Sequence, residues 1–89
     1  MIIYTLRFSD QAKCDIKHHK QSGNKVVVNK TSLLLEELTK HPFIGTGKPE
    51  QLKHNLTGCW SRRINREHRL VYEVVDNVIM ILSAKGHYQ

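Results

Sequence analysis

The apolar residues of this chain change their spacing near its middle. In the first half they recur at helical intervals, as Val27, Leu34 and Leu38 do. In the second half they alternate with other residues, as Leu70 and Tyr72 do, which is the period of a strand. The pattern predicts a helical half followed by a half built of strands.

The first half is predicted to contain one strand and two helices. Ser9 offers an N-cap oxygen to the first helix, and the Ser22-Gly23-Asn24 stretch should stop it. The second helix must end before Pro42, because the residue before a proline resists the helical conformation. Val26-Val27-Val28 is ambiguous, because its propensity favours a strand while its spacing fits the helix. The expected elements are a strand from Ile2 to Arg7, a helix from about Asp10 to Gln21, and a second helix whose firmest part runs from Thr31 to Thr39.

The second half is predicted to be a loop followed by three strands. The stretch from His41 to Glu50 holds both prolines and two of the five glycines, which marks it as a connection. The expected strands run from Gly58 to Ile64, from His68 to Val75 and from Val78 to Lys85, with turns at Asn65-Arg66-Glu67 and Asp76-Asn77. The last strand is apolar on both faces at its start, which is typical of a central strand covered by helices. These elements predict an α+β fold, an antiparallel-dominated sheet with the two N-terminal helices on one face.

Length and composition narrow the class of protein. With 89 residues the chain, 1–89, is expected to form one compact domain. Its longest strongly apolar run, Val78 to Leu82, is far short of the roughly 20 residues that cross a bilayer, so no membrane span is expected. The start lacks the features of a signal peptide, and Cys14 and Cys59 are too far apart for a CxxC motif. A cytoplasmic protein with reduced thiols is expected.

The charge balance favours a polyanionic partner. The chain has 14 Lys and Arg against 8 Asp and Glu, a formal net charge of +6. Four of its five arginines lie close together, at positions 62, 63, 66 and 69. Planar guanidinium groups suit bidentate binding of phosphate. The alternative is a basic strand face that is simply solvated.

Several other chemically versatile residues have an ordinary structural interpretation. His18 and His19 are neighbours on a helix and do not share a face, so we expect solvated side chains and assign no metal or cofactor to this chain. Trp60 and Tyr72 are expected to pack in or against the core rather than to stack on bases. Cys59 is expected to be a small buried hydrophobe and not a nucleophile.

A mixture of acidic, imidazole and cationic side chains nevertheless marks the second half. Its members are Glu50, Lys53, His54, Arg62, Arg63, Arg69 and His87. Metal-free cleavage of RNA needs a base for the 2′-hydroxyl proton, an acid for the leaving 5′-oxygen, and cations for the charge that builds on phosphate. Carboxylate, imidazole and guanidinium groups meet those needs, although any basic surface carries some of them.

The order of these residues carries a resemblance to a known family. The segment GKPEQLKHNLTGCWSRRINREHRLVYEV, followed after a short gap by a near-terminal HY, closely resembles the YoeB-type (Txe) toxins of the RelE/ParE superfamily of bacterial toxin–antitoxin systems. The resemblance runs from Pro42 to Tyr88, while the first half agrees only in its layout of a strand and two helices. It implies a microbial-ribonuclease-like fold and a ribosome-dependent messenger-RNA endonuclease, held inactive by a cognate antitoxin. Homodimer formation is left open.

The resemblance also implies a role for individual residues. The family's general base falls on Glu50, its transition-state arginine on Arg69, and its general acid on His87. The residues that it implies for RNA binding are Lys53, Arg62, Arg63 and Tyr88. The chain departs from the family pattern at Cys59, where an aromatic residue is frequent, and at Gln89, which follows the usual terminal tyrosine.

The predicted hairpin sets a geometric condition on this site. With a two-residue turn at Asp76-Asn77, Arg69 would lie opposite Ala84, and a straight strand would carry His87 to the other face. An odd number of loop residues, a bulge, or an exit from the strand at Gly86 would remove the conflict.

Other functions remain open on the sequence. A non-enzymatic basic binding module, or a ParE-like toxin that acts on a protein target, would use the arginines for binding and would not need Glu50 and His87. A DNA-binding regulator is disfavoured, because the chain has no helix-turn-helix pattern and its arginines lie on or between predicted strands.

Overall fold

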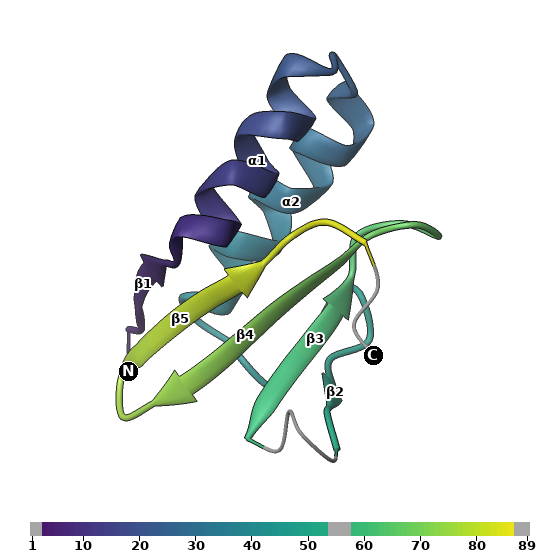
Figure 1. The fold of residues 1–89 in the computed structure, drawn as a ribbon. Coiled ribbons are helices and arrows are strands. Elements are labelled where there is room, and N and C mark those ends of the chain that lie inside the picture. The colour runs from purple at the N-terminus through teal and green to yellow at the C-terminus, as the bar shows by residue number, and fades with distance from the viewer. Residues whose placement is uncertain (1–2, 54–57, 87–89) are drawn as a thin grey trace.

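The helices and strands of the chain form two layers, with both helices on one face of a single sheet (Figure 1). A computed structural model describes residues 3–53 and 58–86. In chain order the elements are β1 (Thr5–Phe8), α1 (Asp10–Gln21), α2 (Lys25–Leu38), β2 (Glu50–Gln51), β3 (Cys59–Arg63), β4 (Arg69–Val75) and β5 (Val78–Ser83). The sheet has the order β1-β5-β4-β3-β2, in which β1 is parallel to β5 and the other neighbours are antiparallel. The predicted α+β class with a mostly antiparallel sheet is confirmed.

The limits of α1 agree with the prediction. Ser9 Oγ accepts a hydrogen bond from the backbone N–H of Ala12 at 3.0 Å, and Asp10 places a negative charge at the positive end of the helix dipole. After Ser22 the chain turns at Gly23, whose φ of 74° lies in the left-handed region that favours glycine. Local capping therefore accounts for both ends of α1.

The second helix begins at Lys25, well ahead of Thr31. Asn24 caps it, because Asn24 Oδ1 accepts a hydrogen bond from the Val27 N–H at 3.2 Å. The ambiguous valine run is therefore helical. Burial outweighs β propensity here, since Val27 lies on the same buried face as Leu34.

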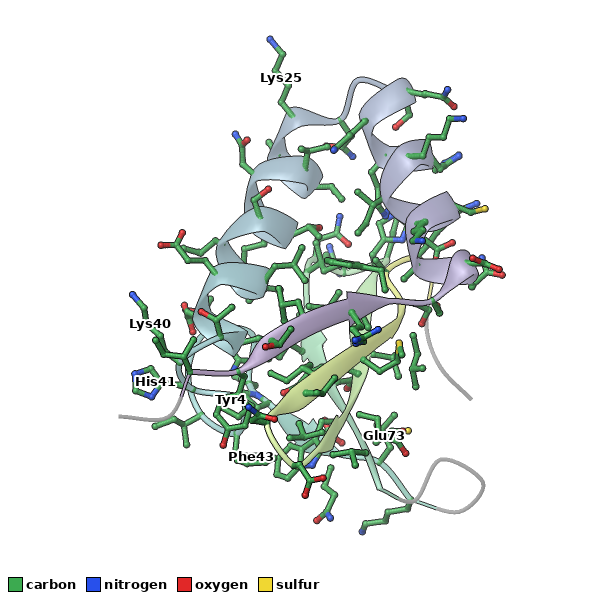
Figure 2. All side chains as sticks on the ribbon, turned by 90° about the vertical axis from the view of Figure 1, so that its left-hand side faces the viewer. Tyr4, Lys25, Lys40, His41, Phe43 and Glu73 are labelled. Carbon is green, nitrogen blue, oxygen red and sulfur yellow. The ribbon has the colours of Figure 1, made fainter. Side chains whose placement is uncertain are left out.

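The core lies between the helices and the sheet. Its buried side chains come from both layers, Ala12, Val27, Leu34 and Leu38 from the helices and Leu70, Tyr72, Ile79 and Ile81 from β4 and β5. In Figure 2, Lys25 marks the end of α2 far from the sheet, and Lys40 and His41 mark the end close to it. Side chains of the β4 residues alternate, so Val71 faces away from this core and packs in a smaller cluster with Leu52 and Cys59.

Three strands differ from the prediction. β1 begins at Thr5, later than expected. β2 was not predicted and lies where the sequence indicates the end of a loop. A strand of two residues is too short to give a periodic pattern, so its pairing with β3 could not be read from the sequence. β5 is an interior strand as predicted, because it pairs with β1 on one edge and with β4 on the other. The middle strand of the sheet is β4, which has two strands on each side. Among the described residues, no helix is long and apolar enough to cross a membrane.

The β4–β5 hairpin has the predicted two-residue turn. Asp76 and Asn77 form it, with Val75 opposite Val78. Asp76 has a φ of 54°, a left-handed conformation that aspartate tolerates in such turns. β5 ends at Ser83, two residues before the predicted end of the strand.

A β-bulge interrupts the same hairpin. Ile81 and Ser83 lie opposite Tyr72 and Val71, which are adjacent on β4, so Leu82 is the extra residue on β5. The bulge shifts the register by one position, and every later residue of β5 faces the side opposite to the one that a regular hairpin would give it. A bulge is one of the three solutions that the predicted site required.

The Arg62 side chain on β3 is buried and ties the long loop to the sheet. Its exposure is 0%, and Nη1 donates to Glu37 Oε1 on α2 at 3.0 Å. The guanidinium also donates to the backbone carbonyls of His41, Ile44 and Thr46. One side chain thus holds the loop after α2 at three points.

Two neighbours complete this Arg62 network. Tyr72 accepts a hydrogen bond from Arg62 Nε at 3.4 Å and donates its own proton to the carbonyl of Pro42 at 2.6 Å. Glu37 also accepts from the backbone N–H and the hydroxyl of Thr46. The five N–H groups of the guanidinium therefore have five partners, as a fully buried charge requires.

Two glycines belong to the same packing. A Cβ on Gly45 would overlap with Glu37 Oε1, and a Cβ on Gly47 would lie 2.8 Å from the Arg63 carbonyl oxygen. Both residues also have positive φ. The Gly47 carbonyl accepts a hydrogen bond from the Arg63 N–H at 2.8 Å, so the loop backbone lies directly against β3. Only glycine allows this approach.

This placement corrects the expectation that Arg62 contacts RNA. Its guanidinium has no exposed surface, and its donors are used inside the protein. Arg63, the next residue, is exposed on the other face because successive side chains of a strand alternate. The two adjacent arginines therefore have different roles, and Arg62 is structural.

We expect Arg62→Met to lower the free energy of unfolding by about 3–5 kcal/mol, because it leaves Glu37 and three loop carbonyls without their donor. Arg63→Met is the matched control on the exposed face and should change the free energy by less than about 0.5 kcal/mol. Urea unfolding followed by circular dichroism measures both variants. Equal losses in the two would contradict the assignment of Arg62 as the anchor.

Acid should weaken the same network through Glu37. Hydrogen bonds from the hydroxyl and the N–H of Thr46, together with Arg62, lower the pKa of Glu37 from its ordinary value of 4.5. Because the pKa of Glu37 is lower in the folded state than in the unfolded state, this carboxylate stabilises the fold at a pH above its ordinary pKa. The stabilisation is lost as the pH falls through the lowered pKa. Glu37→Gln should therefore be less stable at neutral pH and should lose less stability than the wild type on acidification. Thermal unfolding from neutral to acidic pH tests this, and parallel curves for the two proteins would contradict it.

Candidate active site

The predicted base Glu50 lies in β2, at the edge of the sheet. It pairs with Ser61 of β3, and residues directly opposite each other in an antiparallel pair project from the same face. That face is opposite to the one on which Tyr72 meets the helices. The Glu50 side chain is 59% exposed. Its carboxylate is therefore accessible on the face that the helices leave open.

The predicted transition-state cation Arg69 reaches this carboxylate from β4. Arg69 Nη2 lies 3.4 Å from Glu50 Oε2, and Arg69 Nε donates to Ser61 Oγ at 3.1 Å. The Arg69 side chain is only 12% exposed. A held, mostly buried guanidinium thus lies beside an accessible carboxylate, although the two residues come from different strands.

Ser61 is a site residue that the sequence interpretation missed. It is fully buried, and its hydroxyl orients Arg69. The signal was the period of the strand, which places Ser61 and Arg63 on one face and Arg62 on the other. Counting faces along the predicted strand would have separated the two arginines and identified the serine beside them.

Arg63 lies directly opposite Arg69 in the β3–β4 ladder. Two cations opposite each other on one face repel, so an anion between or beside them lowers the electrostatic energy. Glu50 supplies a negative charge to Arg69. The exposed Arg63 remains available to a negatively charged ligand.

The same arginine lines a hollow of about 370 Å³ at the end of β3, which we call the basic hollow. Its lining residues are Lys30, Gly47, Lys48, Arg63, Ile64, Asn65 and Arg66. Four of these carry a positive charge, and none of the described lining residues is acidic. The hollow suits a phosphate group or another small anion.

The other predicted site residues divide into two groups. Lys53 is exposed and follows β2. His87 and Tyr88 lie outside the described residues, and so does His54. The structure therefore brings Glu50 together with Arg69, while the role of His87 as the acid stays a prediction.

The last described residue, Gly86, lies beside Arg69. The Gly86 carbonyl accepts a hydrogen bond from the backbone N–H of Arg69 at 3.0 Å. Gly86 has a φ of 74°, which glycine adopts without strain and which suits the predicted exit from the strand. The residue that follows it in the sequence is His87.

The structural interpretations of three residues are confirmed. Tyr72 is fully buried, and Trp60 is half-buried with its ring 5.0 Å from that of Phe43. Cys59 is buried, and this burial, with the charge of Glu73, raises the pKa of its thiol. A raised thiol pKa opposes a role as nucleophile.

The interpretation of the two adjacent histidines is wrong in part. His18 is exposed as expected, but His19 is only 3% exposed. His19 Nε2 lies 2.8 Å from the carbonyl oxygen of Ala84 and donates to it. The helical pattern missed this residue because a buried histidine interrupts an apolar face.

Comparison with known proteins gives a consistent picture. The family described as YoeB-like toxin of bacterial type II toxin-antitoxin system matches residues 8–88. Toxin YoeB of Synechocystis sp. is 49% identical over 69 residues, which are 78% of this chain and 80% of that protein. The match to the family includes the helical half, which the sequence motifs alone did not cover.

Two solved structures from Staphylococcus aureus have the same fold. One is a YoeB-YefM complex, in which a chain is 51% identical to this one, with a TM-score of 0.84 and coverage of 96% of this chain and 98% of that chain. The other is a YoeB dimer, with 50% identity, a TM-score of 0.85 and the same coverage. The chain therefore belongs to the family of YoeB-like toxins of bacterial type II toxin–antitoxin systems.

Proposed function

We propose that this toxin is a ribosome-dependent messenger-RNA endonuclease that cleaves by metal-free acid–base chemistry. The observation that carries the proposal is the pair of Glu50 and Arg69, 3.4 Å apart on the open face of the sheet. A general base must reach the substrate, and a cation that stabilises developing charge must be held in place beforehand. The exposed carboxylate and the Ser61-bound guanidinium meet these two demands.

The proposed reaction is an attack within the RNA strand. Glu50 takes the proton of a 2′-hydroxyl group, and the oxygen forms a bond to the adjacent phosphorus. The bond from phosphorus to the 5′-oxygen breaks as His87 gives a proton to that oxygen. The products are a 2′,3′-cyclic phosphate and a 5′-hydroxyl group. Arg69 and Lys53 stabilise the extra negative charge on the phosphate oxygens during the reaction.

The length of the Glu50–Arg69 contact supports this division of roles. At 3.4 Å it is longer than the about 2.7–2.9 Å of a tight charge-assisted hydrogen bond. Arg69 Nη2 can therefore turn from Glu50 toward a phosphate. Nε stays bonded to Ser61, which preserves the position of the guanidinium.

The basic hollow extends the RNA surface beyond the reacting phosphate. Arg63 lies opposite Arg69 and also lines the hollow, so it joins the reaction site to Lys48 and Arg66. Successive phosphates of an RNA strand could occupy this row of cations. Such contacts fix the register of the strand without reading its bases.

The relatives suggest the protein partners. A YoeB from Staphylococcus aureus is in complex with YefM, and another structure holds a YoeB dimer. For this chain we expect a cognate antitoxin that holds the toxin inactive, with homodimer formation as a second association to test. Its target, the ribosome with its messenger, would place its action in the cytoplasm.

Loss of the base should abolish activity without loss of fold. We expect Glu50→Gln to lower the rate of messenger cleavage by about 10²–10⁴-fold, because the amide cannot take the hydroxyl proton. His87→Ala should have a similar effect. Primer extension on a messenger in a ribosome-programmed extract measures the cleavage, with Glu36→Gln, an exposed acid on α2, as control.

The same variants separate cleavage from simple binding. Growth arrest that persists in Glu50→Gln and His87→Ala, but is lost when Arg63 is changed, would assign the activity to binding of a target. Unchanged messenger cleavage by both variants would remove the mechanism.

Removal of cations from the basic hollow should weaken RNA binding in a salt-dependent way. For a 2′-O-methyl RNA oligonucleotide, which cannot be cut, we expect Arg63→Gln and Lys48→Gln each to reduce the slope of log affinity against log salt by about 0.7. Lys17→Gln, an exposed cation on α1, is the control and should leave the slope unchanged. Equal slopes for all four proteins would rule the hollow out as an RNA contact.

A further inference from the structure

The segment that follows β5 is held by side chains of α1. The Ala84 N–H donates to Asp15 Oδ2 at 2.9 Å, and the Ala84 carbonyl accepts from His19 Nε2 at 2.8 Å. At the N-cap of α1, Ser9 Oγ donates to the carbonyl of the bulge residue Leu82 at 2.9 Å. The helix thus replaces a strand partner for a stretch of chain that has left the regular ladder.

The other end of this segment is held by β4 and the turn before it. The Gly86 N–H donates to His68 Nδ1 at 2.9 Å, and the Gly86 carbonyl accepts from the Arg69 N–H at 3.0 Å. Gly86 is therefore bound on both sides, and one of its partners is the backbone of the proposed catalytic arginine. We call Asp15, His19 and His68 the clamp.

Burial indicates that the clamp is a built feature and not a chance contact. Asp15 is 5% exposed and His19 is 3% exposed, on a helix face that could pack with apolar residues alone. Buried polar groups cost free energy unless they are hydrogen-bonded. Gln11 Nε2 also donates to Asp15 Oδ1 at 2.8 Å, which orients this carboxylate toward the segment.

The hydrogen bonds fix the protonation of the two clamp histidines. His68 Nδ1 accepts from an N–H group and so carries no proton, whereas His19 Nε2 faces a carbonyl oxygen and must carry one. The two rings meet edge to face with their centres 4.6 Å apart. A proton on His68 Nδ1 would point at the Gly86 N–H and break that hydrogen bond.

Burial and the nearby cationic groups favour the neutral form of His68, while Glu67, whose Oε2 lies 4.0 Å from His68 Nε2, favours the charged form. The titratable and charged groups that face it are His18 and His19 on α1, Glu67 beside it in the turn, and Lys85 in the segment itself. Burial, followed by the charge of His19, lowers the pKa of His68 from its ordinary value of 6.5. Because the folded state binds this proton less tightly than the unfolded state, stability is complete above about pH 6.5 and falls as the pH drops toward the lowered value.

We propose that Asp15, His19 and His68 are positioning residues that hold the backbone of residues 84–86 for RNA cleavage, and that protonation of His68 releases it. The inference rests on the proposed function, because the residue after Gly86 in the sequence is the proposed acid His87. None of the three clamp residues touches the reacting phosphate in this mechanism. They act through the chain that leads to the acid.

Two substitutions of His68 separate the hydrogen bond from the bulk of the ring. His68→Asn keeps an acceptor at the δ position but does not titrate. His68→Gln carries its polar atoms at the ε position and leaves the Gly86 N–H without an acceptor. A parallel pair at the other site is His19→Gln, which keeps a donor at the ε position, and His19→Leu, which does not.

The experiment combines an amide readout with a cleavage readout. Hydrogen exchange of the Ala84 and Gly86 amides is measured by NMR on the free toxin, with correction for the intrinsic effect of pH. Single-turnover cleavage of a messenger on programmed ribosomes is measured from about pH 5 to about pH 8, the range in which histidines titrate.

The clamp makes a specific set of predictions for these variants. His68→Gln removes the acceptor of the Gly86 N–H and should lose the protection of this amide. His19→Leu removes the donor to the Ala84 carbonyl and, by loosening the segment, should lower the protection of the Ala84 N–H, which is bonded to Asp15. Both variants should lower the maximal single-turnover rate by about 10²-fold with little change in the toxin concentration that gives half of it, since small misplacements near a reacting group have effects of that size. His68→Asn and His19→Gln should keep most of the amide protection and most of the cleavage rate. Wild-type cleavage and Gly86 protection should fall together as the pH drops through the lowered pKa of His68, below its ordinary value of 6.5, whereas His68→Asn should lose this step in both readouts.

Each contrary outcome overturns a different statement. Loss of Gly86 protection in His68→Gln with wild-type cleavage would overturn the positioning role and leave the proposed function intact. Equal behaviour of the Asn and Gln variants would show that the hydrogen bond is not what matters. If the wild type cleaves no messenger although its Gly86 amide is protected, the proposed function fails, and with it the catalytic part of this inference. Should His68→Gln not fold, the His19 pair carries the same test.

Discussion

The buried guanidinium of Arg62 is the constraint on which the rest of the structure depends. A loop from His41 to Glu50 has almost no regular structure, so its backbone carbonyls need partners from elsewhere. Arg62 supplies donors to three of them and pairs with Glu37 on α2, while Tyr72 binds a fourth carbonyl. The helix α2, the loop and the sheet therefore meet at one charge. Where the loop rejoins the sheet it becomes β2, so the same charge sets the position of the proposed base.

The proposed site on the open face of the sheet depends on two sets of contacts that hold the chain, one near the proposed base and one near the proposed acid. The Arg62 network brings Glu50 to the edge of β3 from one side. From the other side, the bulge in β5 and the proposed clamp on residues 84–86 lead the chain to Arg69. Arg69 lies between the two attachments and contacts both, through its side chain to Glu50 and through its backbone to Gly86. This geometry explains why an acid–base site can be assembled from segments so far apart in the sequence.

Much of this fold was predictable because local rules decide it. The ends of α1 follow from Ser9 and Gly23, and the turn at Asp76-Asn77 has the length that its residues favour. Pairing across the sheet was not predictable in the same way, since a two-residue strand such as β2 has no local signal and the bulge at Leu82 follows from tertiary contacts. In the site, residue types and their order indicated Glu50 and Arg69, and the period of the strand separates Arg62 from Arg63, but only the structure shows that the face of Arg62 is the buried one.

The central claim is that a 2′-hydroxyl group of the RNA is the nucleophile. A messenger with a single 2′-deoxynucleotide at the cleavage position, presented to the toxin on programmed ribosomes, tests this most directly. We expect no cut at that position, while an unmodified messenger should give an upstream fragment that ends in a 2′,3′-cyclic phosphate. A cut at the deoxy position, or a 5′-phosphate on the downstream fragment, would contradict attack by the 2′-hydroxyl group.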